Sequence, residues 1–533
     1  MAAQVRSADV VETDVCIIGA GITSAMVAER LSEETGADIV VLEAGNEIFN
    51  MSERFSRRAR FLDYGENPWP DDHIRGQTAR GIQSRSMAVG GLALHWGGVT
   101  PRFTPEDFRL RSTYGVGDDW PLDYDELEPF YQEAEERIGV AGERGPDEYD
   151  LRSRPYPLPP MPLSYNLVRL REWAEQSGIP FWANPVAKIT APYRDRQLCR
   201  RCDTCNICPT GAKYTPDLTF QRLLAENRIT LRPRTLVRRL ELDESSDRIV
   251  EAVALDRDRP DRPVRVRADL FVLALGYVWS PHLLLLSRSD RFPDGLANKT
   301  GNVGRWVTGH RSVSAFAEVP FRLYPGMFNG NSLLSKRFQR PGPLDRYVRH
   351  DLRIWDSTSR RGARLRNDDG RLLMGDALLE DWRSRTRTGV TRMRSYYDVI
   401  PDRESRIDLD SGLSNEWGDP MPRITFVDAP ESAALRQHTE RSIRGVFDRI
   451  VGVGGGRILS TSAGNSQDHP GGGCRMGDDP ATSVVDSFGR THDHENLFVV
   501  GAPTMVSGGC ANGTLTFNAL ALRSAGEMAR GLR

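Results

Sequence analysis

One short segment near the amino terminus restricts the possible folds more than any other part of the chain. Residues 14–18 are apolar and run into the turn Gly-Ala-Gly-Ile-Thr-Ser at 19–24. Apolar residues then recur at helical spacing up to Gly36, and residues 39–42 are again apolar. The pattern predicts a strand, a helix and a second strand joined as a right-handed parallel crossover, which indicates the α/β class.

The turn itself predicts a nucleotide site. Gly19 and Gly21 permit a tight turn and a close approach of the backbone to a pyrophosphate, while Ser24 is small enough for the helix to pack on the strand. The unpaired N–H groups and the dipole of the following helix favour an anion. Glu43 ends the second strand, where a carboxylate can hold ribose hydroxyls. The motif alone does not distinguish FAD from NAD.

Length and charge set broad limits. The 533 residues suffice for two or three domain-sized units. Acidic and basic residues nearly cancel, at 73 against 71, so no global field favours nucleic acid or an anionic membrane. The first twelve residues lack a basic region followed by an apolar one, so no secretory signal is predicted. We expect a cytoplasmic protein without a membrane span and without a nucleic-acid partner.

The remaining pattern predicts a cofactor domain that is interrupted by a substrate domain. Residues 65–105 read as Gly-rich and irregular, and residues 153–163 as an extended cover strip. The predicted cofactor domain comprises 1–105, 195–310 and 460–533, and the substrate-binding domain and cover segments comprise 106–194 and 311–459.

Residues 270–287 carry no charged side chain and approach the length of a transmembrane helix. Gly276 and Pro281 interrupt them, so we expect a buried strand, a tight turn and a helix that begins at Pro281. Arg is in local excess around 336–394, where a solvated surface is the simpler interpretation. Further predicted elements are helices at 123–138, 164–176 and 515–532, strands within 229–242 and 249–256, antiparallel strands at 395–400 and 406–409, and a buried strand at 497–500.

A second Gly-rich run, Val-Gly-Gly-Leu-Ala-Leu-His-Trp-Gly-Gly at 89–98, lets the backbone approach a flat ring system. Gly90 and Gly91 are therefore predicted cofactor contacts, unless the run is a surface loop. His95 has two interpretations, a covalent link to a flavin ring or an ordinary packed histidine, and the ordinary one is preferred.

Two residues near the carboxyl terminus suit alcohol oxidation. His469 opens the run His-Pro-Gly-Gly-Gly-Cys-Arg-Met, and Asn512 follows in a second Gly-rich turn. A neutral imidazole can remove a hydroxyl proton near pH 7, since its ordinary pKa is about 6.5. An amide can hold the same oxygen. A structural role for His469 stays open when the residue is considered alone.

Four of the seven cysteines form the run Cys-x2-Cys-x2-Cys-x2-Cys-Pro at Cys199, Cys202, Cys205 and Cys208. The last gap is one residue shorter than in bacterial ferredoxins. Such thiolates can hold an iron–sulfur cluster or zinc, and structural cysteines, reduced or paired, are the alternative. An iron–sulfur cluster is preferred over zinc because a reduced flavin needs an outlet for its electrons.

Together these segments resemble the glucose–methanol–choline (GMC) oxidoreductases, a family of FAD enzymes. The resemblance rests on the Gly19/Gly21/Glu43 unit, 90–96, Trp120-Pro121-Leu122-x-Tyr124, Gly276 with Ser280-Pro281, Asn302-x-Gly304-Arg305, 469–476, and Asn512 through the last helix. It implies a Rossmann-like FAD-binding domain with an inserted α+β substrate domain built on an antiparallel sheet. It also implies that His469 is the base and Asn512 its partner.

Within the family, Leu94-His95-Trp96 with 100–103 is similar to pyranose oxidases and bacterial glycoside 3-oxidases, some of which bind flavin covalently through the matching histidine. Gly97 replaces their Thr beside the flavin, which puts oxygen reactivity in doubt. Residues 208–212 are similar to the cluster region of FAD glucose dehydrogenases, which carry a three-iron cluster, although the Cys spacing differs. The predicted cofactor contacts are Gly19, Gly21, Ser24, Glu43, Gly90, Gly91, His95, Trp96, Val237, Gly501 and Thr514.

The resemblance implies FAD-dependent oxidation of a secondary hydroxyl of a sugar or glycoside to a ketone. Oxygen, a quinone or an electron-transfer protein would reoxidise the flavin. The alternative is a sugar dehydrogenase subunit that passes electrons through the Cys quartet to a cytochrome or quinone. A flavoprotein without redox chemistry, such as a lyase, and an NAD-dependent enzyme are less favoured. The sequence leaves the substrate and the oligomeric state open.

Overall fold

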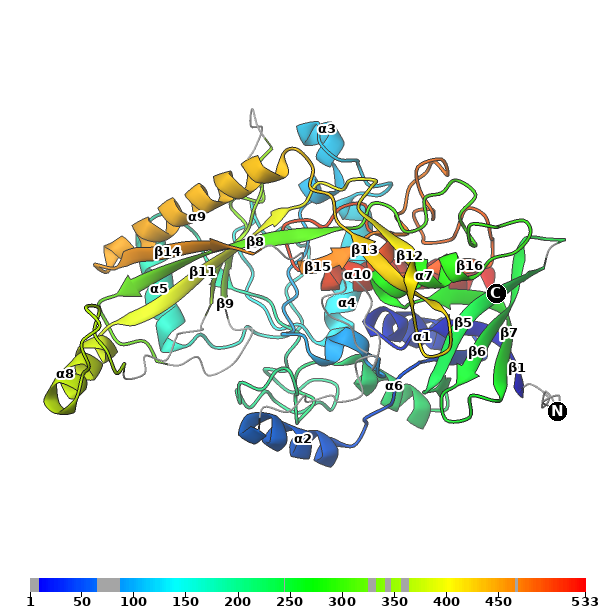
Figure 1. Cartoon of the computed structure of the whole chain (residues 1–533), viewed down its shortest axis with the longest axis horizontal. Coiled ribbons are helices and arrows are strands. Elements are labelled where there is room, and N and C mark those ends of the chain that lie inside the picture. The colour runs from blue at the N-terminus through cyan, green and yellow to red at the C-terminus, as the bar shows by residue number, and fades with distance from the viewer. Residues whose placement is uncertain are drawn as a thin grey trace.

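The computed structural model describes residues 9–64, 87–243, 245–324, 332–340, 347–355, 364–464 and 468–533. Figure 1 shows two sheets along the long axis of the molecule, one on the right near both termini and one on the left beside helix α9. Part of the predicted irregular segment 65–105, at 65–86, lies outside the described residues.

The α-helices are α1 (Ile22–Glu34), α2 (Met51–Tyr64), α3 (Leu110–Tyr114), α4 (Tyr124–Ile138), α5 (Tyr165–Gln176), α6 (Pro216–Ala225), α7 (Gly276–Leu286), α8 (Gly375–Thr386), α9 (Ser432–Val453) and α10 (Thr514–Gly531). The strands are β1 (Asp9–Ile18), β2 (Ile39–Leu42), β3 (Trp182–Ala183), β4 (Thr230–Arg232), β5 (Thr235–Asp243), β6 (Arg248–Asp256), β7 (Pro263–Leu273), β8 (Thr308–Val319), β9 (Ser332–Ser335), β10 (Leu352–Trp355), β11 (Gly389–Asp398), β12 (Arg406–Ser414), β13 (Pro420–Thr425), β14 (Arg457–Ala463), β15 (Asp468–Gly471) and β16 (Leu497–Val499).

The first sheet has the order β4-β2-β1-β7-β6-β5, with β16 also paired to β7. Strands β4, β2, β1, β7 and β16 pair in parallel, and β5 and β6 form an antiparallel hairpin at one side. Residues of β1 and β2 near the Gly19 turn are buried, as expected for a parallel sheet covered on both faces. Helices α1 and α10 pack against each other beside this sheet. The predicted crossover and the predicted α/β class are confirmed.

Two predicted helices begin as their cap residues require. The Asp123 side chain accepts a hydrogen bond from Glu126 N, and the Glu126 side chain accepts from Asp123 N, which completes a capping box before α4. Ser164 Oγ accepts from Leu167 N at the start of α5. These contacts satisfy N–H groups that the first helical turn leaves without a partner in the helix.

The apolar segment 270–287 forms the end of β7 and then α7, but the helix begins at Gly276 and not at the predicted Pro281. Gly276 makes the turn with a φ of +81°, a conformation that L side chains rarely adopt. Pro281 therefore lies inside the helix. No helix among the described residues is both long and apolar enough to cross a membrane.

The second sheet has the order β14-β8-β11-β10-β9-β3, with β15 also paired to β8, and its pairs are antiparallel. Its two faces differ. Val313, Ala315, Ile354 and Met393 point to one side and join a buried apolar cluster with residues of α5 and α9. The alternate residues form a polar face that carries most of the candidate site.

The two expected antiparallel strands at 395–400 and 406–409 exist, but they do not share a sheet. The first belongs to β11, whereas β12 pairs with β13 in a separate two-stranded sheet. The predicted domain division stays a prediction. Strand β8 runs through its boundary at 310, and β14 and β15, which lie near the boundary at 460, pair with β8 in the second sheet.

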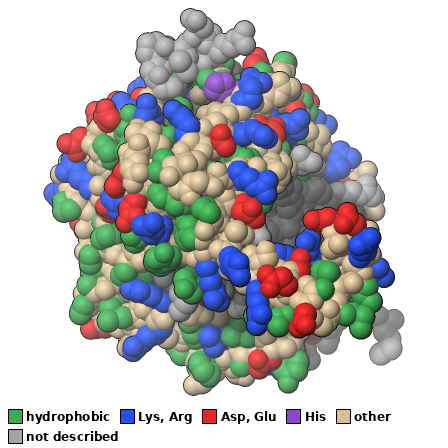
Figure 2. Space-filling model, turned by 90° about the vertical axis from the view of Figure 1, so that its left-hand side faces the viewer, with side chains coloured by type: hydrophobic (Ala, Val, Ile, Leu, Met, Phe, Trp, Pro, Cys, Tyr) green, Lys and Arg blue, Asp and Glu red, His purple; other side chains and the backbone are tan. Residues whose placement is uncertain are grey.

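The composition of the Arg-rich region 336–394 suggested a solvated surface. The structure shows that some of its arginines are buried instead. Arg349 and Arg353 are fully buried, because Asp107 and Asp398 pair with the first and Asp351 pairs with the second. Figure 2 shows the end of the molecule that lies on the left in Figure 1, where Lys and Arg side chains are interspersed with Asp and Glu. No single sign of charge dominates that face.

Candidate active site

The turn between β1 and α1 is shaped for an anionic ligand. Gly19 has a φ of +96°, and a Cβ there would lie 2.8 Å from the carbonyl oxygen of Ala274. Gly21 caps α1 without a side chain, and the first turn of the helix carries no acidic residue. The N–H groups at this helix end are thus available to a phosphate, and the helix dipole favours its charge.

Glu43 lies at the same turn, as its position after β2 predicts. Its carboxylate accepts hydrogen bonds from Ala20 N at 2.9 Å and from Gly45 N at 2.8 Å. Burial raises the pKa of Glu43, and these backbone hydrogen bonds act in the opposite direction. The acid is therefore held beside the Gly turn in a fixed orientation.

The second Gly-rich run packs directly on the first. Gly90 N donates to Ala20 O at 2.8 Å, and a Cβ on Gly91 would lie 3.5 Å from Gly21 Cα. Gly501 abuts Thr23 in the first turn of α1. The structure thereby brings several predicted cofactor contacts around one helix end: Gly19, Gly21, Ser24, Glu43, Gly90, Gly91 and Gly501. Val237 is on β5 and Thr514 begins α10, and their contact with a cofactor stays a prediction.

His95 and Trp96 follow a short 3-10 turn, Gly91–Leu94. Hydrogen bonds to Tyr214 and Lys213 hold this loop in place. Trp96 Nε1 donates to Tyr214 O at 2.8 Å. Lys213 Nζ donates to Leu94 O at 2.8 Å and to Trp96 O at 2.9 Å. The segment that carries the predicted flavin contacts is therefore tied to the segment that follows the Cys quartet.

All four cysteines of the quartet line one small cavity, together with Lys188 and Lys213. All seven cysteines lie in the described part of the chain, and none forms a disulfide. No three sulfurs of the quartet approach one another within 4.8 Å. A tetrahedral zinc site needs sulfurs about 3.8 Å apart, given Zn–S bonds of about 2.3 Å. The quartet, as arranged here, therefore does not match a preformed tetrahedral zinc site.

The surroundings of Cys208 favour its thiolate, whereas burial raises the pKa of Cys199. Burial alone would raise the pKa of Cys208, but hydrogen bonds from the backbone of Lys213 and Thr210 and the Lys213 charge lower it. The Lys213 backbone N–H lies 3.3 Å from Cys208 Sγ, and Lys213 Nζ donates to Cys205 O at 2.6 Å. Burial also lowers the pKa of Lys213 to about 7. Backbone N–H groups and a nearby positive charge both stabilise a thiolate, and both therefore lower the pKa of a cysteine.

His469 and Asn512 meet although 43 positions separate them. Asn512 Nδ2 lies 2.8 Å from His469 Nε2. His469 is on β15, which pairs with β8, and Asn512 comes just before α10. Gly472 N donates to Ala502 O at 2.9 Å, and Gly501 next to it abuts the start of α1. The segment that follows His469 is therefore linked through Gly472, Ala502 and Gly501 to the predicted nucleotide turn.

A chain of hydrogen bonds fixes which imidazole nitrogen of His469 carries a lone pair. The amide nitrogen of Asn512 can only donate, so His469 Nε2, which it contacts, must accept. The proton of His469 is then on Nδ1, and His310 Nε2, 2.9 Å from His469 Nδ1, accepts it. Arg353 Nη1 donates to Asn512 Oδ1, which turns the amide NH2 of Asn512 toward His469 Nε2. His469 Nε2 is thus the basic atom.

Burial, together with the charges around the pair, keeps both histidines neutral. Burial lowers the pKa of His310 well below its usual value, and His469 and Arg353 contribute. Burial, Arg353 and Arg394 lower the pKa of His469 to about 3. Both rings are therefore neutral at pH 7, as a proton acceptor must be.

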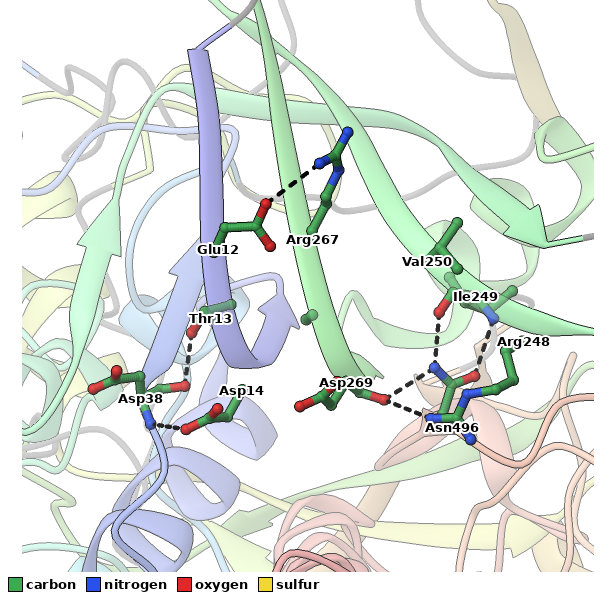
Figure 3. A pocket seen from close by; sticks show the side chains of 11 residues that line it. Glu12, Thr13, Asp14, Asp38, Arg248, Ile249, Val250, Arg267, Asp269 and Asn496 are labelled. Carbon is green, nitrogen blue, oxygen red and sulfur yellow. Dashed lines mark hydrogen bonds and ion pairs between the residues drawn. The ribbon is translucent and has the colours of Figure 1, made fainter.

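A separate polar pocket of about 460 Å³ lies beside the amino-terminal part of β1 (Figure 3). Its polar groups satisfy one another: Asn496 bridges β6 and β7 through Ile249 and Asp269, and Asp14 accepts from Asp38 N. The carboxyl end of β1, with the Gly19 turn, and the His469 pair lie elsewhere. We assign no chemistry to this pocket.

Comparison with known proteins agrees with this geometry. A family model described as GMC oxidoreductase matches residues 401–521. The large subunit of fructose dehydrogenase from Gluconobacter japonicus is 31% identical over 99% of this chain and 99% of its own length. The chain belongs to the GMC oxidoreductases. As a GMC oxidoreductase it is an FAD-dependent enzyme that acts on CH–OH groups.

Further similar proteins support the same family. Paromamine 6'-oxidase from Streptomyces fradiae is 31% identical over 97% of this chain and 91% of its own length. The crystal structure of pyridoxine 4-oxidase from Mesorbium loti matches with a TM-score of 0.65 and 19% identity, over 97% of this chain and 99% of that one. The GMC fold predicted from the sequence is therefore confirmed. The bare end of α1 and the paired Gly runs fit FAD.

Three residues beside the candidate pair escaped prediction from the sequence. His310 and Arg353 are fully buried beside the pair, yet neither lies in a recognisable motif. Tyr396, whose ring packs 4.3 Å from His310, was missed for the same reason. The only sequence signal is that His310 alternates with the apolar residues of β8 and so shares a face with Ser312.

Proposed function

We propose that the chain oxidises a secondary hydroxyl group of a sugar or glycoside to a ketone. The observation that carries the proposal is the pair of His469 Nε2 and Asn512 Nδ2 at 2.8 Å. The names of the relatives, which act on fructose and on aminoglycosides, support a sugar hydroxyl as the reacting group.

Each residue of the candidate site would have its own role in the reaction. A substrate hydroxyl replaces the direct contact of the pair, so that it donates its proton to His469 Nε2 and accepts from Asn512 Nδ2. His310 holds His469 through Nδ1, and Arg353 holds Asn512 through Oδ1. The Gly runs and Glu43 would hold FAD, which would supply the hydride acceptor. Orientation and proton removal are the protein's contributions.

The experiment that tests the proposal is an absorbance spectrum of the purified yellow protein under argon, before and after addition of a panel of sugars and glycosides. We expect the flavin absorbance to bleach with at least one sugar and a ketosugar to form in equal amount. A flavin that stays oxidised with every sugar, while a simple alcohol bleaches it, would contradict the proposal.

A second candidate concerns the electron acceptor. Here the protein is a dehydrogenase whose Cys quartet holds an iron–sulfur cluster that passes electrons to a cytochrome or quinone. Lys213 supports it, because one buried ammonium joins the carbonyl groups of Leu94, Trp96 and Cys205. A cluster at the quartet would therefore lie beside the flavin-contacting loop. Protein purified without oxygen should contain iron and sulfide; hydrogen peroxide formed in step with substrate, without iron, would favour the oxidase.

A further inference from the structure

The polar face of the second sheet presents a row of cations next to the candidate pair. Arg353 of β10 lies opposite Arg394 of β11, and Trp355 lies opposite Arg392. Ile354 and Met393, which lie between them, point to the opposite face and into the apolar cluster. Because side chains alternate along a strand, the three arginines and Trp355 share one face.

This row contains donors that no part of the described chain satisfies. Arg353 Nη2, Arg392 Nε and Trp355 Nε1 are buried, and none of them has a hydrogen-bond partner among the described residues. All three groups can only donate. A buried donor without an acceptor is unfavourable, and a buried charge without a counter-ion is more so. The row therefore lacks an acceptor group, which a ligand can supply.

The charge balance of the row also favours a ligand that carries acceptor oxygens and negative charge. Asp351 pairs with Arg353, and Asp468 pairs with Arg394. Arg392 forms no ion pair with any residue that the structure describes, and its guanidinium lies over the Trp355 ring at 6.0 Å. Burial and the neighbouring Arg394 lower the pKa of Arg392. One positive charge thus remains without a partner, and an ammonium group placed here would be repelled.

The row begins at the candidate pair. Arg353 donates to Asn512 Oδ1, and Trp355 and Arg392 follow two residues farther along the strands, roughly 7 Å away. That separation is comparable to the width of one sugar ring. The pyrophosphate of the nucleotide has a separate anion site at the end of α1, so the row is not required for it.

We propose that Arg353, Arg392 and Trp355 bind an anionic group of the substrate, so that an acidic sugar places its hydroxyl at His469 and Asn512. The ligand class is a sugar that carries a carboxylate or a phosphate, recognised through the same acceptor oxygens. This inference rests on the proposed sugar oxidation. Arg394, already paired with Asp468, supplies charge at the edge of the row.

The test compares neutral and acidic sugars in the reductive half-reaction under argon. Glucose, methyl glucoside, glucuronate, methyl glucuronide, gluconate and glucose 6-phosphate serve as probes. We expect at least one acid to reduce the flavin at a half-saturating concentration about tenfold or more below that of its neutral counterpart. Comparing the half-saturating concentrations of the carboxylate sugars with that of glucose 6-phosphate then shows whether the row prefers a carboxylate or a phosphate.

Variants locate the effect. Arg392→Gln should raise the half-saturating concentration of the preferred acid by about ten- to a hundredfold, the amount expected for a charge-assisted hydrogen bond. Arg392→Lys, which keeps the charge, should recover part of the loss. Arg457→Gln is the matched control, because Arg457 is 74% exposed on β14 of the same sheet. Thermal melting shows whether each variant is folded.

A binding measurement separates the two proposals. Calorimetric titration of the FAD-loaded His469→Ala variant with the acids should show binding that weakens with added salt and with Arg392→Gln. If neutral sugars bleach the flavin and acids neither bind nor react better, the anion site is wrong and sugar oxidation stands. If no sugar bleaches the flavin but acids bind through Arg392, the anion site stands and sugar oxidation is wrong.

Discussion

His310 Nε2 lies 2.9 Å from His469 Nδ1, and the two rings belong to strands that pair in the same sheet. His469 Nε2 accepts from the Asn512 amide, so the proton of His469 resides on Nδ1 and His310 Nε2 accepts it. A histidine buried behind a base can thus stabilise its tautomer without touching the substrate.

His310 is therefore expected to act as a positioning residue. His310→Phe removes the acceptor for the His469 Nδ1 proton, so the imidazole can turn or change tautomer. We expect flavin reduction by substrate to slow by about ten- to a hundredfold, the usual cost of a misplaced reacting group. Anaerobic stopped-flow absorbance measures it.

The control distinguishes position from folding. His310→Gln offers an amide oxygen to the same proton and should recover much of the rate. A His310→Phe enzyme that is folded, yellow and as fast as the unaltered protein would show that the contact has no part in orienting His469.

Lys213 is expected to hold the Cys quartet and the flavin loop together. Lys213→Met leaves three carbonyl groups without their donor, at about 1–3 kcal/mol for each one that stays buried. We predict a lower melting temperature and, for protein made without oxygen, a loss or an altered electron paramagnetic resonance signal of any bound cluster.

Lys213→Arg provides the comparison, since it keeps the charge and several donors. Iron analysis reports the quartet independently of turnover. Unchanged stability together with unchanged metal content in Lys213→Met would refute the bridging role.

Acid is expected to destabilise the fold through buried histidines. Burial lowers the pKa of His282 and of His350 to about 4, below the value of about 6.5 in an unfolded chain. Below pH 6.5 the unfolded chain binds protons that the folded chain does not, so stability falls with pH until about pH 4. At pH 5.5 the loss is about 1.4 kcal/mol for each histidine.

Denaturant unfolding at pH 7.5 and pH 5.5 measures this loss. His282→Gln can still donate to the Pro420 carbonyl and should reduce the difference between the two pH values by about 1.4 kcal/mol. An identical pH difference in the variant would mean that His282 already titrates normally in the folded protein.

FAD retention is expected to depend on the contact of the two Gly runs. Gly91 has a φ of +54°, and a Cβ there would face Gly21 at 3.5 Å. Gly91→Val adds a branched side chain at a backbone conformation that such residues avoid, and it fills the space above the turn. We predict that the purified variant contains little flavin, as judged by the ratio of absorbance at 450 and 280 nm.

Gly115→Val is a suitable comparison, because Gly115 also has a positive φ, of +73°, but a Cβ there meets nothing within 4 Å. It should lose some stability and keep its flavin. Full flavin content in Gly91→Val would place the cofactor away from this turn.

The sequence allowed a good prediction of the parts that local chemistry determines. The Gly19 turn, the capped starts of α4 and α5, and the strands of the first sheet follow from spacing and from turn residues within a short stretch. His469 and Asn512 each lie in a Gly-rich run that matches a family pattern, and the structure brings the two side chains together, while their catalytic roles stay a prediction.

The rest depends on contacts between distant segments. Pairing of β10 with β11 buries Arg353 and aims it at Asn512, and no local pattern distinguishes that arginine from exposed ones nearby. β12 pairs with β13 and not with β11, since register is set by the packing of each sheet. Helix α7 begins at Gly276 and not at the predicted Pro281, because Gly276 adopts the positive φ that the turn before the helix requires.

The most direct test of the account concerns His469 itself. His469→Ala should bind FAD and remain yellow, because the residue lies outside the Gly19 and Gly90 turns, while anaerobic flavin reduction by the best sugar slows by about 10²–10⁴-fold. A rate of flavin reduction equal to that of the unaltered enzyme, measured in stopped flow at saturating sugar, would contradict the assignment of His469 Nε2 as the base.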